Sequence, residues 1–180
     1  MDFLELVKKR KSVRRYISKP VSRDLIDRCL EAARLAPSAC NSQPWSFIVV
    51  EDKKTRHEIV KKALSGIYRA NAFVREATVL IVVVTEHSSY IARMGGQLRH
   101  VKYSLIDIGI AGEHLILQAA ELGLGTCWLG WFNEKAVKKI LGLSRYKHID
   151  VMISLGYPEA GMEKTRKRKS MEKIRKYFNT

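Results

Sequence analysis

The stretch Arg34-Leu-Ala-Pro-Ser-Ala-Cys-Asn-Ser-Gln-Pro-Trp-Ser-Phe-Ile-Val-Val50 joins a segment with helical periodicity to a segment with strand propensity. Pro37 ends the helix, because proline has no N–H to donate and disfavours helical backbone in the residue before it. Trp45 and Phe47 then open a run of residues that favour a strand. The loop between them is rich in Ser, Asn and Gln, and a polar loop held between two packed elements commonly carries binding residues. The alternative is an ordinary polar connection with Trp45 as core filler.

Hydrophobic periodicity predicts further helices and strands on both sides of this stretch. Residues 78–85 are apolar on both faces, which is typical of an interior strand, whereas 148–156 alternates and predicts a strand with one polar face. The helix predicted over 98–122 is apolar around much of its circumference, so we expect it to be buried within the fold or against a partner chain. Residues 86–97 contain two glycines and are expected to form a lid loop. We expect helices over 2–9, 23–36, 53–64, 98–122 and 134–141, and strands over 47–51, 78–85 and 148–156.

Both ends of the chain carry an apolar stripe. Phe3, Leu4, Leu6 and Val7 are expected to point inward from the first helix. Near the other end, Met171, Ile174 and Phe178 recur at helical spacing. This stripe indicates that the C-terminal tail packs against another surface rather than remaining in solvent.

Length and composition are typical of one domain over residues 1–180 that can bury a substantial core. No apolar run reaches the length of a membrane span, and the N-terminus lacks a signal-peptide pattern, so we expect a cytoplasmic protein without a membrane partner. Cys29, Cys40 and Cys127 are an odd number without CxxC spacing, a pattern that favours neither a disulfide framework nor a zinc site.

The net charge of +15 is concentrated at the two ends of the sequence. Residues 8–19 contain seven basic side chains and no acidic one, and residues 164–176 contain eight basic side chains against Glu172 alone. If the ends meet, they build a focused anion site. Two solvated tails are the other interpretation.

Three polar residues of the first basic segment share one face. Arg10, Ser12 and Arg14 alternate, so in extended backbone their side chains point the same way. Two guanidinium groups and a hydroxyl that converge on one spot suit a phosphate group.

The stretch Gly123-Leu-Gly-Thr-Cys-Trp-Leu-Gly-Trp131 follows the longest predicted helix. It is not a dinucleotide fingerprint, which must follow a strand and open a helix, and it lacks the GK[ST] of a P-loop. Its glycines instead favour close approach of backbone N–H groups to a flat ligand. We interpret Cys127 as a structural thiol rather than a nucleophile.

Taken together, five stretches resemble the FMN-dependent nitroreductase family, in the family's order and across nearly the whole chain. The similarity is to the shorter members of that family. The stretches are Arg10-Lys-Ser-Val-Arg-Arg-Tyr16, Ala36-Pro-Ser-Ala-Cys-Asn-Ser-Gln-Pro-Trp45, Ala70-Asn-Ala-Phe-Val-Arg-Glu-Ala77, Gly123-Leu-Gly-Thr-Cys-Trp-Leu-Gly130 and Arg166-Lys-Arg-Lys-Ser-Met-Glu-Lys-Ile174.

The resemblance implies an α+β, nitroreductase-like fold. A mixed central sheet would be flanked by helices, and the long central helix would lie at the interface of an obligate homodimer with two shared FMN sites. Basic residues from both chain ends would hold the phosphate, and the loop after the second helix would come from the partner. The residues implied are Arg10, Ser12, Arg14, Arg166 and Arg168 for the phosphate, Pro37, Ser38, Ala39 and Asn41 from the partner's loop, Asn71 toward the pyrimidine ring, and the Leu129–Gly130 backbone toward flavin N5 and O4.

The implied activity is reduction of nitroaromatics, quinones or similar small oxidants with NADH or NADPH by a ping-pong hydride transfer. Because FMN carries the redox chemistry, no catalytic side chain and no metal ligand is nominated. Two alternatives stay open: the same fold with reductive dehalogenation or flavin fragmentation, and a basic module that binds nucleic acid. The second explains the charge but leaves the 37–45 loop and the 123–130 glycines without a role, so nucleic acid is not the expected partner.

Overall fold

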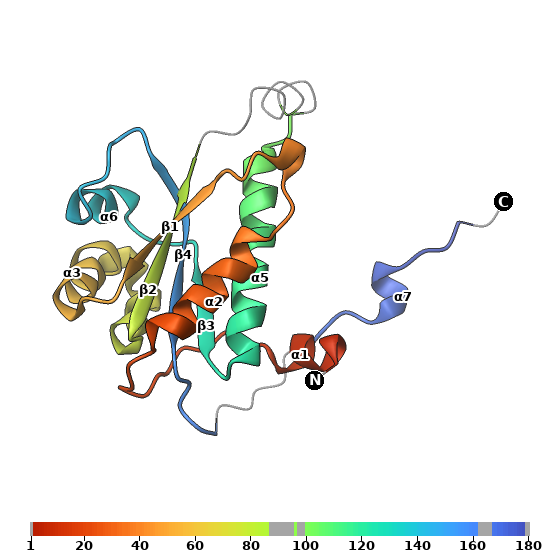
Figure 1. The fold of residues 1–180 in the computed structure, drawn as a ribbon, viewed down its shortest axis with the longest axis horizontal. Coiled ribbons are helices and arrows are strands. Elements are labelled where there is room, and N and C mark those ends of the chain that lie inside the picture. Colours follow the sequence, from red (N-terminus) through yellow and green to blue (C-terminus); the bar gives the residue numbers. More distant parts are fainter. Residues whose placement is uncertain (1, 87–95, 97–99, 162–166, 179–180) are drawn as a thin grey trace.

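The chain folds around one antiparallel sheet of four strands (Figure 1). The computed structural model describes residues 2–86, 96, 100–161 and 167–178. Its strands are β1 (Trp45–Val50), β2 (Val79–Thr85), β3 (Gly125–Leu129) and β4 (His148–Gly156), in the order β1-β2-β4-β3. Trp45 lies opposite Thr85, and Gly125 lies opposite Gly156.

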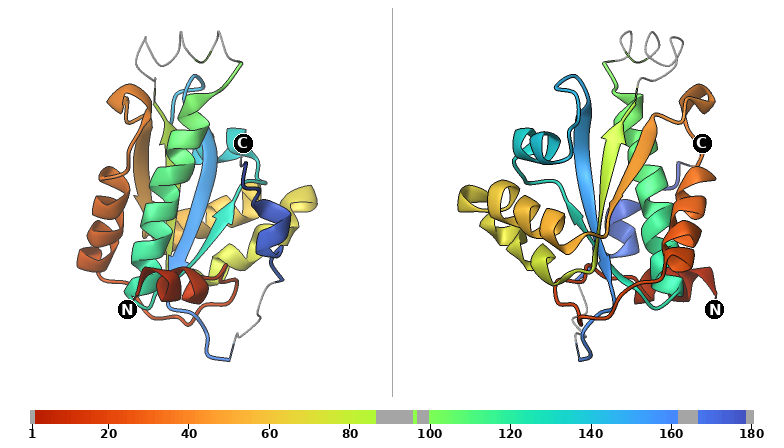
Figure 2. Two further views of the ribbon diagram at one scale, coloured as in Figure 1. Left: turned by 90° about the vertical axis from the view of Figure 1, so that its right-hand side faces the viewer. Right: turned by 60° about the vertical axis from the view of Figure 1, so that its left-hand side comes forward.

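Helices cover both faces of this sheet, as the second view in Figure 2 shows. On one side lie α2 (Arg23–Arg34) and α5 (Tyr103–Glu121), and on the other lie α3 (Lys53–Ala63), α6 (Glu134–Ile140) and the 3-10 segment Gly66–Glu76. Successive residues of β2 alternate between two apolar clusters, because side chains in a strand alternate between its faces. The remaining elements are α1 (Phe3–Lys9), the short 3-10 turn Ala39–Asn41 and α7 (Met171–Ile174).

The α+β class is confirmed, and two expectations about the sheet are corrected. The sheet was expected to be mixed, but its four strands pair antiparallel throughout, and the parallel contact is the isolated bridge between Ser12 and Thr126. β4 does not have one polar face: Met152 and Ser154 are buried as deeply as their neighbours, and only the start of the strand is exposed. The reason is that helices cover the second face as well.

The apolar stripes at the chain ends are exposed in the single chain, contrary to the sequence expectation. Phe3 and Leu4 of α1 are 63% and 62% exposed, because α1 lies at the surface against α5. α7 stands away from the body in Figure 1, and Phe178 is 93% exposed. Leu105 and Ile106 of α5 are also exposed. A contiguous patch of exposed apolar side chains is typical of a protein interface.

The predicted helix over 98–122 is observed as α5, with residues 97–99 outside the described part of the chain. The lid loop expected over 86–97 also falls mostly outside it. Within the described ranges, the helices are too short or too polar to cross a membrane.

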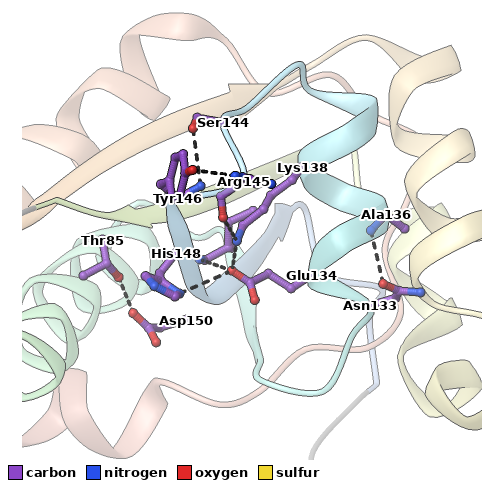
Figure 3. Close-up of polar contacts among 11 residues, drawn as sticks. Thr85, Asn133, Glu134, Ala136, Lys138, Ser144, Arg145, Tyr146, His148 and Asp150 are labelled. Atoms are coloured by element: carbon purple, nitrogen blue, oxygen red, sulfur yellow. Dashed lines mark hydrogen bonds and ion pairs between the residues drawn. The ribbon is translucent and has the colours of Figure 1, made fainter.

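A polar cluster fixes α6 against the start of β4 (Figure 3). The Glu134 carboxylate accepts hydrogen bonds from Lys138 Nζ at 2.7 Å and from the Ile149 N–H at 3.0 Å, and lies 3.8 Å from His148 Nδ1. Partial burial raises the pKa of Glu134, but the hydrogen bonds from Lys138 and Ile149 outweigh it, so the pKa lies below its usual value.

We expect Glu134 to make folding stability depend on pH. Because its folded pKa is lowered, its contribution is present above the unfolded pKa and is lost as pH falls through the folded pKa. Glu134→Gln should therefore cost about 1 kcal/mol at neutral pH and little in acid. Urea unfolding of the wild-type protein and of Glu134→Gln, from acid to neutral pH, measures this difference in the free energy of unfolding. Glu58→Gln, which removes an exposed ion pair with Lys62, is the control, and an equal pH slope in all three proteins would contradict the assignment.

Gly125 allows the N-terminal segment to approach β3 closely. A Cβ at this position would lie 2.7 Å from Val13 Cγ2 and 2.8 Å from Val13 Cβ, and Val13 is buried. Gly125→Ala should therefore lower the free energy of unfolding by about 1–3 kcal/mol through overpacking. Gly130→Ala is the matched control, since a Cβ there meets nothing within 4 Å. Denaturant unfolding that finds the two variants equally stable would contradict this packing.

Candidate functional site

The segment after α1 runs along the outer edge of β3 and is held there by backbone and side-chain bonds. The Val13 N–H donates to the Thr126 carbonyl at 2.8 Å. The Tyr16 hydroxyl donates to the Val13 carbonyl at 2.8 Å and lies 2.8 Å from Ser154 Oγ. Burial raises the pKa of Tyr16, so it remains protonated. With Val13 and Tyr16 anchored in the interior, Arg14 is left exposed on the other side of the segment.

Arg10 and Arg14 contact different parts of the protein along this edge. Arg10 follows α1 and faces α5: burial raises the pKa of Glu113, and the positive charge of Arg10 opposes that shift. The Arg14 guanidinium lies over the ring of Phe73, 5.9 Å from its centroid. The basic segment is thereby joined to the 3-10 segment that contains Asn71.

Asn71 in turn contacts the backbone that follows β3. Its Nδ2 donates to the Trp131 carbonyl at 2.8 Å. The Trp131 indole N–H donates to the Ile67 carbonyl at 3.2 Å, and its ring lies 5.3 Å from that of Tyr68. Gly130, which precedes Trp131 in the chain, is exposed with open space where a side chain would be. Leu129 is buried in the core, so of these two predicted residues Gly130 is the one exposed at this surface.

Five predicted residues lie on segments that meet at the β3 edge of the sheet, namely the N-terminal segment, the 3-10 segment and the end of β3. We call Arg10, Ser12, Arg14, Asn71 and Gly130 the edge cluster. It combines two cations, a hydroxyl, an amide and an open backbone, which are groups that bind a phosphate and a flat polar ring.

The loop at 37–41 lies elsewhere in the single chain. The Ala39 N–H donates to Asp107 Oδ1 near the start of α5 at 3.0 Å, and Figure 1 shows this loop beside the upper end of α5 while α1 lies beside the lower end. Cys40 and Asn41 have φ of 52° and 50°, a left-handed conformation that asparagine tolerates better than most residues. Pro37, Ser38, Ala39 and Asn41 are therefore not brought to the edge cluster of their own chain.

The C-terminal arginines are also not joined to that cluster within the described chain. Arg168 is exposed on the segment that leads to α7, and the contacts described for the edge cluster do not include it. Arg166 lies outside the described residues.

Sequence reasoning missed three residues that shape this region. The ring of Phe73 lies under the Arg14 guanidinium, and Trp131 connects Asn71 to the ring of Tyr68. Trp131 ends the glycine stretch, so its position was visible in the sequence, but its two hydrogen bonds depend on the fold. Asp107 was detectable as a carboxylate on an otherwise apolar helix face, where it is buried and holds the 38–41 backbone.

Comparisons with known proteins show which family this sequence is similar to. The sequence matches the model of the family described as "Nitroreductase family" over residues 7–71 and 67–157. A protein from Archaeoglobus fulgidus named "Putative NADH dehydrogenase/NAD(P)H nitroreductase" is 35% identical over 164 residues, which cover 88% of this chain and 86% of that protein. An iodotyrosine deiodinase from Thermotoga neapolitana is 29% identical over 176 residues, which cover 86% of this chain and 88% of the relative.

A solved structure gives the same result for the fold. The crystal structure of a nitroreductase family protein from Clostridium novyi NT has a TM-score of 0.78 and 32% sequence identity, and the match covers 92% of this chain and 89% of that one. The family match spans more than half of the chain and includes β1 to β4. The chain therefore belongs to the nitroreductase family, and it is an oxidoreductase of the nitroreductase type.

Proposed function

We propose that this chain is an FMN-dependent NAD(P)H oxidoreductase that reduces nitroaromatics, quinones or similar small oxidants by a ping-pong hydride transfer. The observation that carries the proposal is the edge cluster, where Arg14, Asn71 and the open Gly130 backbone are linked through Phe73 and Trp131. Relatives whose names include NADH or NAD(P)H, such as the Archaeoglobus protein, support the proposed hydride donor.

The residues of the edge cluster fit FMN. Arg10, Ser12 and Arg14 supply charge-assisted donors for a phosphate. The absence of a side chain at Gly130 leaves room for a ring to approach the backbone, where an N–H would donate to it. The chemistry supplied by bound FMN is transfer of hydride from NAD(P)H and then of electrons to the oxidant. The protein binds and orients the reactants, and its cations and N–H donors stabilise developing negative charge.

A homodimer would complete this site. In the single chain, Pro37, Ser38, Ala39 and Asn41 lie away from the edge cluster, so we propose that they reach it from the partner chain. The exposed apolar residues of α1, α5 and α7 support an interface. A docked tail would also carry Arg166 and Arg168 toward the phosphate. Three free cysteines support a reducing compartment, the cytoplasm.

The substrates would be planar molecules. Tyr68 and the 58%-exposed Trp131 present aromatic rings next to Gly130, and such rings favour flat aromatic partners. Reductive dehalogenation is the second candidate, because iodotyrosine deiodinases are among the relatives.

Purified protein tests the proposal directly. We expect a flavin absorbance band, and steady oxidation of NADH or NADPH with nitrofurazone or menadione. Faster turnover with halogenated phenols would favour the second candidate instead. A colourless protein that takes up no FMN would contradict both.

A further inference from the structure

A polar cavity lies at another corner of the molecule, where β1 ends and β2 begins. It has a volume of about 240 Å³. Its polar lining comes from Ser18, Glu51, Arg56 and Thr78, with Val21 and Val79 as apolar walls. None of these residues belongs to the edge cluster.

Two of the residues that line this cavity, Arg56 and Thr78, each have a buried hydrogen-bond donor without a protein acceptor among the described residues. Arg56 is only 8% exposed; one end of its guanidinium donates to the Glu51 carbonyl. Its Nε is buried and has no hydrogen-bond partner in the described part of the chain, and the same holds for Thr78 Oγ1. Buried donors left without an acceptor are costly, above all on a charged group. The site therefore calls for an oxygen acceptor.

The nearby carboxylates already have other donors. Glu51 Oε2 accepts from Arg23 Nε at 3.0 Å. Asp52 accepts from the N–H and the hydroxyl of Thr55, both at 2.7 Å, and thereby caps α3. Neither carboxylate is recorded as accepting from Arg56 Nε or Thr78 Oγ1. These two donors remain for an external group.

We propose that this cavity binds a small oxyanion, a phosphate or a carboxylate, through Arg56 Nε and Thr78 Oγ1. A guanidinium and a hydroxyl match the oxygens of such a group. Ser18 supplies a further hydroxyl at the rim, and the engagement of Glu51 by Arg23 limits its repulsion of the ligand.

The test follows the Arg56 Nε–Hε signal by NMR in protein saturated with FMN, so that the flavin phosphate site is not available to the added ion. Arg56→Lys removes the signal and so assigns it. We expect saturable shifts on titration with inorganic phosphate or acetate, but not with chloride at matched ionic strength. Tighter binding of phosphate would identify the ligand as a phosphate, and tighter binding of acetate would identify it as a carboxylate.

Two variants complete the test. Thr78→Val removes one donor while keeping the shape, and should weaken binding about tenfold. Lys61→Ala removes a charge from the outer surface of the same helix and should leave the affinity unchanged. The proposal is overturned if no oxyanion shifts the Arg56 signal, or if both variants weaken binding equally.

Discussion

Replacing Met171, Ile174 and Phe178 by serine is expected to split the proposed homodimer and to release FMN. These side chains are exposed in the single chain, with Phe178 almost fully so. No part of the chain that the structure describes covers this apolar stripe. If the partner buries them, the substitutions remove about 5–9 kcal/mol of association free energy, an upper limit from the burial of three large side chains. Sedimentation velocity at micromolar protein and the flavin absorbance of the same sample measure both effects.

A charge variant in the same tail separates docking from electrostatics. Lys173→Ala with Lys176→Ala leaves the apolar residues in place and should preserve the dimer. A triple serine variant that remains dimeric and yellow would show that the tail is not part of the interface.

Arg14→Ala is expected to have the second largest effect, a loss of FMN affinity. If Arg14 binds the FMN phosphate as proposed, the substitution removes one charge-assisted hydrogen bond worth about 1.5–3 kcal/mol, which corresponds to about ten- to a hundredfold in Kd. Fluorescence titration of the apoprotein with FMN measures it. The fold should tolerate the change, since Arg14 is exposed and its recorded contact is with the Phe73 ring.

The next residue in the chain is a matched control. Arg15 is also exposed, but it lies 3.9 Å from Glu159 rather than over Phe73, because neighbouring side chains in extended backbone point in opposite directions. Arg15→Ala should therefore leave FMN affinity unchanged. Equal losses in both variants would mean that the N-terminal arginines act only through general surface charge.

Local signals in the sequence were sufficient for most of the fold. The apolar run at 78–85 predicts the buried strand β2, and the helix predicted over 134–141 is observed as α6, which Asn133 caps by accepting from the Ala136 N–H at 3.1 Å. The same signals could not reveal what covers each face. The alternation at 148–156 suggested a polar face for β4, because the sequence does not show that helices pack on both sides of the sheet.

For the site, only the family resemblance predicted that Arg14, Asn71 and Gly130 belong to one region, and the structure links the segments that carry them. Alternation explains why Val13 is buried and Arg14 exposed. It could not show that Asn71 already bonds Trp131, because that contact joins segments sixty residues apart. The separation of the 37–41 loop from the edge cluster is likewise a property of the assembled chain.

The measurement that tests the central claim most directly is subunit mixing. Arg14→Ala and Asn41→Gly each weaken FMN binding if Arg14 of one chain and Asn41 of its partner build the same site. A heterodimer of the two variants then contains one site with both defects and one fully native site, so FMN titration should recover native affinity at half of the sites. If both residues served the same chain's site, every site would carry one defect and mixing would restore nothing, and the shared site would be contradicted.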